Sequence, residues 1–323
     1  MKAVETTSVT VVSPSMAASV VSPRPHVAPP RRARRPPLFR EKARDGRLLV
    51  LPAVAVVAVL LLVPIGQAVY YSMTNWNGIS SQWVGPATYL TEFRNPLFWR
   101  VLENNALLLI AVPVTMLCGV TLAALLHERV WGWRVFRAAI IIPTAVSWVV
   151  LGLIGIQAFA QAGLINRFLG AVGLHSLERN WLGSPGDALV AVAITFVYSL
   201  VGVNTLIFVT GMSTIDPAIY EAGKLDGTGW FQSYRHLTLP LLRRYFIFTF
   251  VITTISAFSA LFSLIYTMTG GGPDYGTTTI EFFIYQQAFG TGAFGVGALL
   301  GVILFVILAS VSVIQAYLMV RSE

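Results

Sequence analysis

The sequence predicts an all-helical integral membrane protein with six transmembrane helices, and three observations support this fold class. The chain has 323 residues, of which 55% are hydrophobic and only 11% are charged, whereas a soluble domain carries about 25% charged residues. Its polar surface is therefore too small to cover a water-exposed globule. Six long apolar runs follow a basic N-terminal segment, and the lysines and arginines gather in alternate segments between these runs.

Each apolar run lacks charged residues and histidine and is long enough to cross a bilayer as a helix. About 20 residues at 1.5 Å per residue cross a hydrocarbon core of about 30 Å. Helix is the expected state because an isolated strand would leave its backbone polar groups unpaired in lipid. Pro113 and Pro143 predict kinks in the second and third runs. The runs are Leu48–Tyr71, Ala106–Leu126, Ala138–Ala160, Ala188–Met212, Tyr245–Thr267 and Phe294–Val320.

Residues 1–47 precede the first run and are rich in Ser, Pro, Ala, Val and Arg, with RRARRPP at positions 31–37. Because this segment has no sustained helical or strand period, we expect a disordered basic tail. A signal peptide is the alternative, but the apolar run begins too late and is too long for one. The basic residues fit a topology signal, and contact with anionic lipid headgroups is a second possible role.

The distribution of positive charge predicts the orientation of the chain in a multi-pass arrangement. If the N-terminus is inside, 18 of the 22 lysines and arginines lie on the inner side and four on the outer side. The positive-inside rule then places both termini in the cytoplasm, in a cell or inner membrane. It also places residues 213–244 in the cytoplasm. The net charge of +8 therefore reflects topology, and we expect no nucleic-acid partner.

The titratable residues argue against proton coupling and against catalysis by this chain. All 14 acidic residues and all four histidines lie outside the six runs, whereas proton-coupled carriers generally place such relays within the membrane. If this chain carries out an energy-requiring process, the energy must then come from elsewhere. A membrane glycosyltransferase or protease would need paired carboxylates, a Ser-His pair or a metal cluster, but Glu103, Glu128 and Asp187 are scattered. Cys118 is the single cysteine, and we expect neither catalytic residues nor a metal site.

The most informative segment is Ser213–Leu242, a polar stretch between two apolar runs. It has the pattern of two short helices joined by a glycine turn. Asp216 can cap the first helix, and Gly227 can end it. The second helix, Trp230–Leu239, is expected to stop at Pro240.

This segment resembles the EAA loop of permease subunits of ABC importers, in which E-A-A is followed by D-G and then by L-P. In that family the loop is a coupling helix that docks into a cleft on a separate ATPase subunit. The chain departs from the family form at Gly223 (usually Ala), Thr228 (usually Ala) and Leu237 (usually Ile). The resemblance implies these ATPase-coupling residues: Glu221, Ala222, Gly223, Asp226, Gly227, Leu239 and Pro240.

The predicted outer segments resemble the sugar-importer branch of the same family. A T-G-G-G-P turn at 269–273 precedes a threonine-rich stretch and YQQAF at 285–289, and GLIN at 163–166 is followed by Trp181-Leu182. In that branch the glycine-rich region lies near the external gate and the docked binding protein. A flexible re-entry turn is the alternative. The gate residues that the resemblance implies are Gly270, Gly271, Gly272 and Pro273.

Neutral polar and aromatic residues within the runs suit an uncharged, hydroxyl-rich solute better than an ion. Single Ser or Asn residues in membrane helices more often bond a neighbouring helix than a ligand, so packing is the alternative for each. The expected substrate-pathway residues are Asn204, Tyr198, Ser256, Ser259 and Phe262. Phe258 and Tyr266 add further aromatic faces.

Taken as a whole, the resemblance implies a type I importer permease with an accessory first span at 48–71, an external loop at 72–105 and a five-helix core at 106–320. It implies a second, similar permease subunit, two ATPase subunits and an external solute-binding protein. The implied substrate is a mono- or oligosaccharide or a polyol, and the alternatives are glycerol phosphate, amino acids or peptides. This chain is expected to bind no cofactor, because ATP and magnesium would bind the ATPase subunits.

Overall fold

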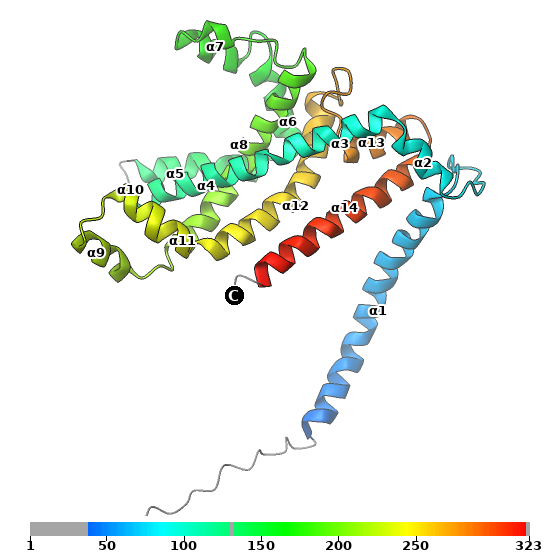
Figure 1. The fold of residues 1–323 in the computed structure, drawn as a ribbon, viewed down its shortest axis with the longest axis horizontal. Coiled ribbons are helices and arrows are strands. Elements are labelled where there is room, and N and C mark those ends of the chain that lie inside the picture. Colours follow the sequence, from blue (N-terminus) through cyan, green and yellow to red (C-terminus); the bar gives the residue numbers. More distant parts are fainter. Residues whose placement is uncertain (1–37, 129–131, 321–323) are drawn as a thin grey trace, which may run out of the picture. The chain divides into compact units, whose positions relative to one another are not determined.

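The structure is a computed structural model that describes residues 38–128 and 132–320, and most of these residues are helical (Figure 1). The α-helices are α1 (Leu38–Ser72), α2 (Ala87–Phe93), α3 (Pro96–Leu109), α4 (Ala111–His127), α5 (Trp133–Ile141), α6 (Trp148–Phe159), α7 (Leu164–Ala171), α8 (Pro185–Met212), α9 (Pro217–Leu225), α10 (Trp230–Ser233), α11 (Leu239–Leu241), α12 (Arg243–Met268), α13 (Ile280–Tyr285) and α14 (Phe294–Val320). Two 3-10 helices, η1 (Ile142–Ala145) and η2 (His175–Leu177), and two π-helical turns, η3 (Tyr234–Thr238) and η4 (Gln286–Gly290), complete these elements.

Five helical segments of the described chain are long and apolar enough to cross a membrane. They are Val50–Ser72, Pro96–His127, Pro185–Met212, Arg243–Met268 and Phe294–Tyr317. A sixth segment consists of α5 with η1, followed by α6, and it bends by 110° at the break. The break lies at residues 146–147, which are not helical, a few residues after Pro143, where the sequence predicted it. Pro143 itself lies within η1, where α5 gives way to a 3-10 turn. The six apolar runs are thus all helical, and the third is a bent pair.

The second membrane segment begins ten residues earlier than the sequence predicted. Residues 72–105 were expected to form an external loop, but this stretch contains α2 and most of α3. Asn95 caps α3 by accepting a hydrogen bond from the Leu97 backbone N–H at 3.0 Å, and Pro96 follows it. The apolar run starts late because Arg100, Glu103 and two asparagines occupy the first turns. α3 and α4 meet at Ile110, three residues before Pro113.

The first helix also begins earlier than expected. α1 starts at Leu38, so the last ten residues of the predicted disordered tail are helical, whereas residues 1–37 lie outside the described residues. α1 begins early because residues 38–44 (LFREKAR) are mostly strong helix formers. The chain divides into two compact units within α1, after Val57. The remaining description concerns the unit from Ala58 onward.

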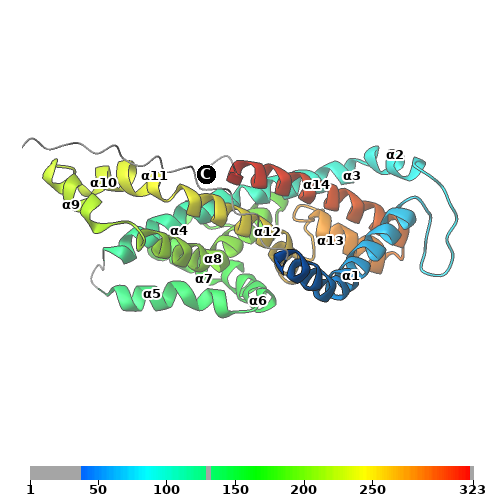
Figure 2. The same ribbon diagram turned by 90° about the horizontal axis from the view of Figure 1, so that it is seen from below.

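The core of this unit lies where α4, α6, α8 and α12 pack together. Phe196 and Phe208 of α8 and Leu261 of α12 are among its fully buried side chains. Close approach of α4 and α8 depends on Gly119, since a methyl group there would lie 2.8 Å from the Cβ atom of Asn204. A second cluster joins α3, α13 and α14. Figures 1 and 2 show that α9–α11 and α13 lie at opposite ends of α12.

Candidate functional site

The first half of the 213–242 segment folds as its sequence predicts. The Asp216 side chain caps α9 by accepting a hydrogen bond from the Ala218 N–H at 2.9 Å. Gly227 has φ +78°, a left-handed conformation that favours glycine, and it directly follows the C-cap residue Asp226. The Thr228 N–H donates to the Gly223 carbonyl at 3.0 Å, which satisfies a carbonyl in the last turn of α9.

The second half of the segment differs from the prediction at Pro240. The helix that begins at Trp230 was expected to stop there, but it continues as the π-helical turn η3 and then as α11. Pro240 lies in the first turn of α11, where a missing N–H is tolerated. The η3 turn closes with the Leu239 N–H donating to the Tyr234 carbonyl. The chain therefore enters α12 at Arg243 without an intervening loop.

The structure brings the predicted coupling residues into one helix–turn–helix. Glu221 and Ala222 are exposed on α9, and Asp226, Gly227 and Pro240 are also exposed. Gly223 is buried, and Leu239 packs against the core. The same segment exposes large apolar side chains, with Leu225 at 89%, Phe231 at 62% and Trp230 at 50%. Such a cluster on a polar segment is typical of a protein-binding surface.

The three departures from the family form lie in contact with one another. A methyl group at Gly223 would meet Leu237 Cδ1 at 2.9 Å and Thr228 Oγ1 at 3.0 Å. The Thr228 hydroxyl in turn donates to the Gly223 carbonyl at 2.7 Å. A small residue at 223 thus makes room for larger neighbours at 228 and 237, so the three positions form one packing unit.

We expect Gly223→Ala alone to lower the stability of this segment. Overpacking typically costs about 1–3 kcal/mol, which exceeds the gain of about 1 kcal/mol in helix propensity. The triple change with Thr228→Ala and Leu237→Ile should recover most of that loss. Thermal unfolding of the detergent-solubilised subunit would measure both, and Gly229→Ala, where a methyl group meets nothing within 4 Å, is the matched control. Equal destabilisation by the single and triple variants would contradict this coupling.

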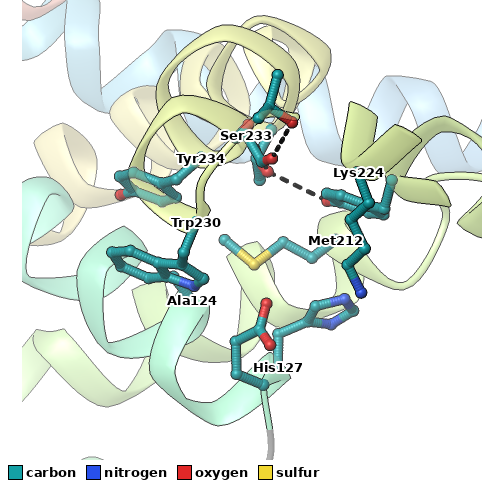
Figure 3. A pocket seen from close by; sticks show the side chains of 11 residues that line it. Ala124, His127, Met212, Lys224, Trp230, Ser233 and Tyr234 are labelled. Atoms are coloured by element: carbon teal, nitrogen blue, oxygen red, sulfur yellow. Dashed lines mark hydrogen bonds between the residues drawn. The ribbon is translucent and has the colours of Figure 1, made fainter. Parts of the chain in front are cut away.

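A cavity of about 190 Å³ lies between the end of α4 and the 213–242 segment (Figure 3). Met212 projects into it, while His127 of α4 and Lys224 of α9 lie on one side. Trp230 and Tyr234 stack with ring centroids 5.6 Å apart. Burial raises the pKa of the Tyr234 hydroxyl, and a hydrogen bond with Thr121 partly offsets this effect. These contacts attach the segment to the membrane-spanning helices.

Threonine side chains bind the T-G-G-G-P turn closely. The Thr277 hydroxyl pairs with the Thr269 hydroxyl at 2.7 Å and donates to the Gly272 carbonyl at 2.9 Å. The Thr278 hydroxyl donates to the Gly271 carbonyl at 2.9 Å. Thr277, Thr278 and Thr279 are fully buried. Of the predicted gate residues, Gly270 is exposed, Gly271 is buried, and Gly272 and Pro273 are half-buried.

The predicted substrate residues separate into two groups. Asn204 is 1% exposed and lies between α4, α8 and α12, where its Oδ1 accepts a hydrogen bond from Thr253 at 3.0 Å. Its Nδ2 has no hydrogen-bond partner among the described residues. The Thr253 bond thus links Asn204 of α8 to α12. Tyr198 is 51% exposed on α8.

The other three predicted substrate residues lie on α12. Ser259 is exposed, and Ser256 and Phe262 are half-buried. Ser259, Phe262 and Tyr266 recur at the i, i+3, i+7 spacing of one helix face. Tyr266 lies beside Tyr285 with ring centroids 5.6 Å apart, and Tyr285 contacts the exposed Phe289. This open aromatic face (Phe262, Tyr266, Tyr285 and Phe289) was predicted only in part.

These features define a class of protein. Several membrane-spanning helices pack around an apolar core, and a capped helix–turn–helix with exposed apolar side chains continues directly into one span. In the described chain, no group of three or more His, Cys, Asp and Glu side chains could hold a metal ion. This combination is that of a membrane transport subunit.

The family is shown by sequence comparison. Residues 111–321 match the model of the binding-protein-dependent transport system inner membrane component, and the chain belongs to this family of ABC-importer permeases. The matched range includes the whole 213–242 segment and the T-G-G-G-P turn.

Relatives and a solved structure agree with this assignment. The trehalose/maltose transport system permease protein MalF of Thermococcus litoralis is 30% identical over 280 residues, which are 85% of this chain and 93% of the relative. The sn-glycerol-3-phosphate transport system permease protein UgpA of Pectobacterium atrosepticum is 30% identical over 272 residues, 83% of this chain and 91% of the relative. A bacterial alginate ABC transporter, solved in complex with an alginate pentasaccharide-bound periplasmic protein, has a chain of the same fold, with TM-score 0.73, 18% identity and coverage of 88% of this chain and 98% of that chain.

Proposed function

We propose that this permease is the membrane-spanning subunit of an ATP-driven sugar importer and that its 213–242 segment docks on a separate ATPase subunit. The observation that carries the proposal is the exposed surface of that segment. Glu221 and Ala222 are exposed beside Leu225, which is 89% exposed, and the same segment also exposes Phe231 and Trp230. Each Å² of apolar surface that is buried against a partner contributes about 25 cal/mol of favourable free energy to association. The chain itself would carry no catalytic residue, and ATP and magnesium would bind the partner.

The geometry supports a division of roles within the segment. Glu221 would make a polar contact with the ATPase, and Ala222 would allow close approach. Gly227 would keep the sharp turn between the two helices. Because α11 leads directly into α12, movement of the docked segment would reach the membrane without a flexible joint. The complete transporter would contain two ATPase subunits, a second permease subunit and an external binding protein, with both termini of this chain in the cytoplasm.

A cross-link tests the docking. We expect Ala222→Cys, in a Cys118→Ser background, to cross-link to the co-expressed ATPase subunit in a nucleotide-dependent way. Thr291→Cys is the matched control, because Thr291 is also exposed but lies beyond the opposite end of α12. A correctly inserted protein with no cross-link at Ala222→Cys, or with equal cross-linking at Thr291→Cys, would contradict the proposed docking surface.

The substrate class is proposed from the open aromatic face. Tyr266 is 51% exposed and Phe289 is 71% exposed, and aromatic faces with a few polar groups suit a sugar ring. Ser256, Ser259 and Tyr198 would supply hydroxyl groups along the pathway. One relative is named for the transport of trehalose and maltose, and the solved structure is named for alginate. Both names support a sugar substrate. Uptake of labelled disaccharides by cells that carry the complete transporter would test this class.

Glycerol phosphate is the second candidate, because one relative carries that name. A phosphate group is usually held by arginine or lysine side chains. The apolar cores of the six runs contain no Lys or Arg, which favours the uncharged sugar. Inhibition of sugar uptake by added glycerol 3-phosphate would favour glycerol phosphate as the substrate.

A further inference from the structure

Two neighbouring asparagines near the start of the second membrane segment bind a loop that lies far along the chain. Asn104 Nδ2 donates to two carbonyl oxygens, that of Tyr275 at 2.8 Å and that of Thr278 at 2.9 Å. The partners are 171 and 174 residues away in sequence. Asn104 is 2% exposed, and its bond to the Thr278 carbonyl is buried. The Tyr275 carbonyl also accepts a hydrogen bond from the Thr278 N–H at 3.2 Å.

Asn105 binds the next part of the same loop. Its Oδ1 accepts a hydrogen bond from the Ile280 N–H at 2.7 Å, and its Nδ2 lies 3.3 and 3.4 Å from the two carboxylate oxygens of Glu281. The Ile280 N–H belongs to the first turn of α13, where no intrahelical acceptor exists. Asn105 thus caps α13 from another helix. Burial raises the pKa of the Glu281 carboxyl, and the Asn105 amide is one of the groups that offset this effect.

Apolar packing continues the same attachment. Phe98 and Val101 of α3 form a buried cluster with Ile280 and Phe283 of α13 and with Leu299 and Leu300 of α14. Asn104 and Asn105 follow on the next turn of α3. The 269–281 loop is therefore held to α3 by a polar pair beside an apolar cluster, in addition to the threonine bonds within the loop.

We propose that Asn104 and Asn105 are positioning residues that hold the 269–281 loop in the shape that receives the external binding protein. This role rests on the proposed function of the chain as an importer permease. The loop would move as one body with the second membrane segment, because these two adjacent side chains bind three backbone groups and one carboxylate of the loop region.

The test exchanges the two partners of one bond. Asn105→Asp keeps the acceptor for the Ile280 N–H but sets a carboxylate against Glu281. Adding Glu281→Gln restores a donor and an acceptor with the roles inverted. Asn77→Asp is the matched control, because the exposed Asn77 side chain serves only as an acceptor, for the N–H groups of Ile79 and Ser80 and the Ser80 hydroxyl.

The first readout reports the loop itself and does not depend on transport. Thr279 is fully buried next to Ile280, so Thr279→Cys in a Cys118→Ser background should react slowly with maleimide in the assembled, detergent-purified transporter. We expect Asn105→Asp to raise the labelling rate by about tenfold to about hundredfold, as loss of a buried hydrogen bond implies. The exchanged pair should return the rate to within about threefold of the reference.

The second readout reports docking. Asn105→Asp should raise the binding-protein concentration that half-saturates ATPase stimulation, with little change in the maximal rate, and the exchanged pair should reverse this shift. An unchanged labelling rate in Asn105→Asp would overturn the attachment. Faster labelling with an unchanged half-saturating concentration would overturn the positioning role. If no binding protein stimulates the ATPase of the reference transporter, the proposed function is wrong. The labelling rates would still decide whether the asparagines hold the loop.

Discussion

Gly227→Pro is expected to abolish solute uptake while leaving the protein inserted in the membrane. Gly227 has φ +78°, whereas the proline ring holds φ near −65°, so the turn after α9 cannot form. Without this turn α9 loses its fixed direction relative to α10, and the exposed surface around Glu221 is no longer presented to the ATPase. The measurement is uptake by cells that contain equal amounts of membrane-inserted protein.

Gly229→Pro provides the control for this prediction. Gly229 lies two residues away and has φ −72°, which proline adopts without strain, and a side chain there meets nothing within 4 Å. The variant loses only the hydrogen bond from the Gly229 N–H to the Gln232 side chain. We expect it to keep most of the uptake. Loss of uptake in both variants would mean that proline itself, rather than the turn at Gly227, is responsible, and normal uptake in Gly227→Pro would remove the segment from its coupling role.

Gly119→Val is expected to destabilise the membrane-spanning core strongly. A Cβ atom at position 119 would lie 2.8 Å from Asn204 Cβ and 3.3 Å from backbone atoms of α8. Since backbone cannot move aside as a flexible side chain does, α4 and α8 must separate. The cost should reach or exceed the upper end of the range of about 1–3 kcal/mol for overpacked cores. Thermal unfolding of the purified subunit in detergent would show it as a large drop in midpoint temperature.

Gly301→Val is the corresponding control. Gly301 is also a glycine within a membrane-spanning helix, but a methyl group there meets nothing within 4 Å. We therefore expect an unfolding midpoint close to that of the native chain. Similar losses in both variants would show that the effect comes from replacing any helical glycine rather than from the contact between α4 and Asn204.

The sequence predicted the elements that depend on local signals. The cap at Asp216 and the turn at Gly227 follow from residue types whose backbone preferences are strong, and the structure confirms both. The bend in the third run falls at residues 146–147, a few residues after the predicted Pro143. Hydrophobic length alone located the long helices. These features need no knowledge of distant parts of the chain.

The features that were missed depend on contacts between distant residues. Asn104 and Asn105 were assigned to an external loop because polar residues interrupt the apolar run, although Asn95-Pro96 is a recognisable helix start. Their partners lie more than 170 residues away, and one sequence carries no sign of that proximity. The burial of Asn204 between three helices is likewise a product of tertiary packing.

The π-helical turn η3 has a consequence for how this chain aligns with its relatives. A π-turn contains one more residue than the α-helical turn that it replaces, and each residue advances an α-helix by about 100°. A relative with ordinary helix at positions 234–238 would therefore need a one-residue gap there to keep the faces of α12 in phase. A gap placed elsewhere between α9 and α12 would pair residues from different faces of the span.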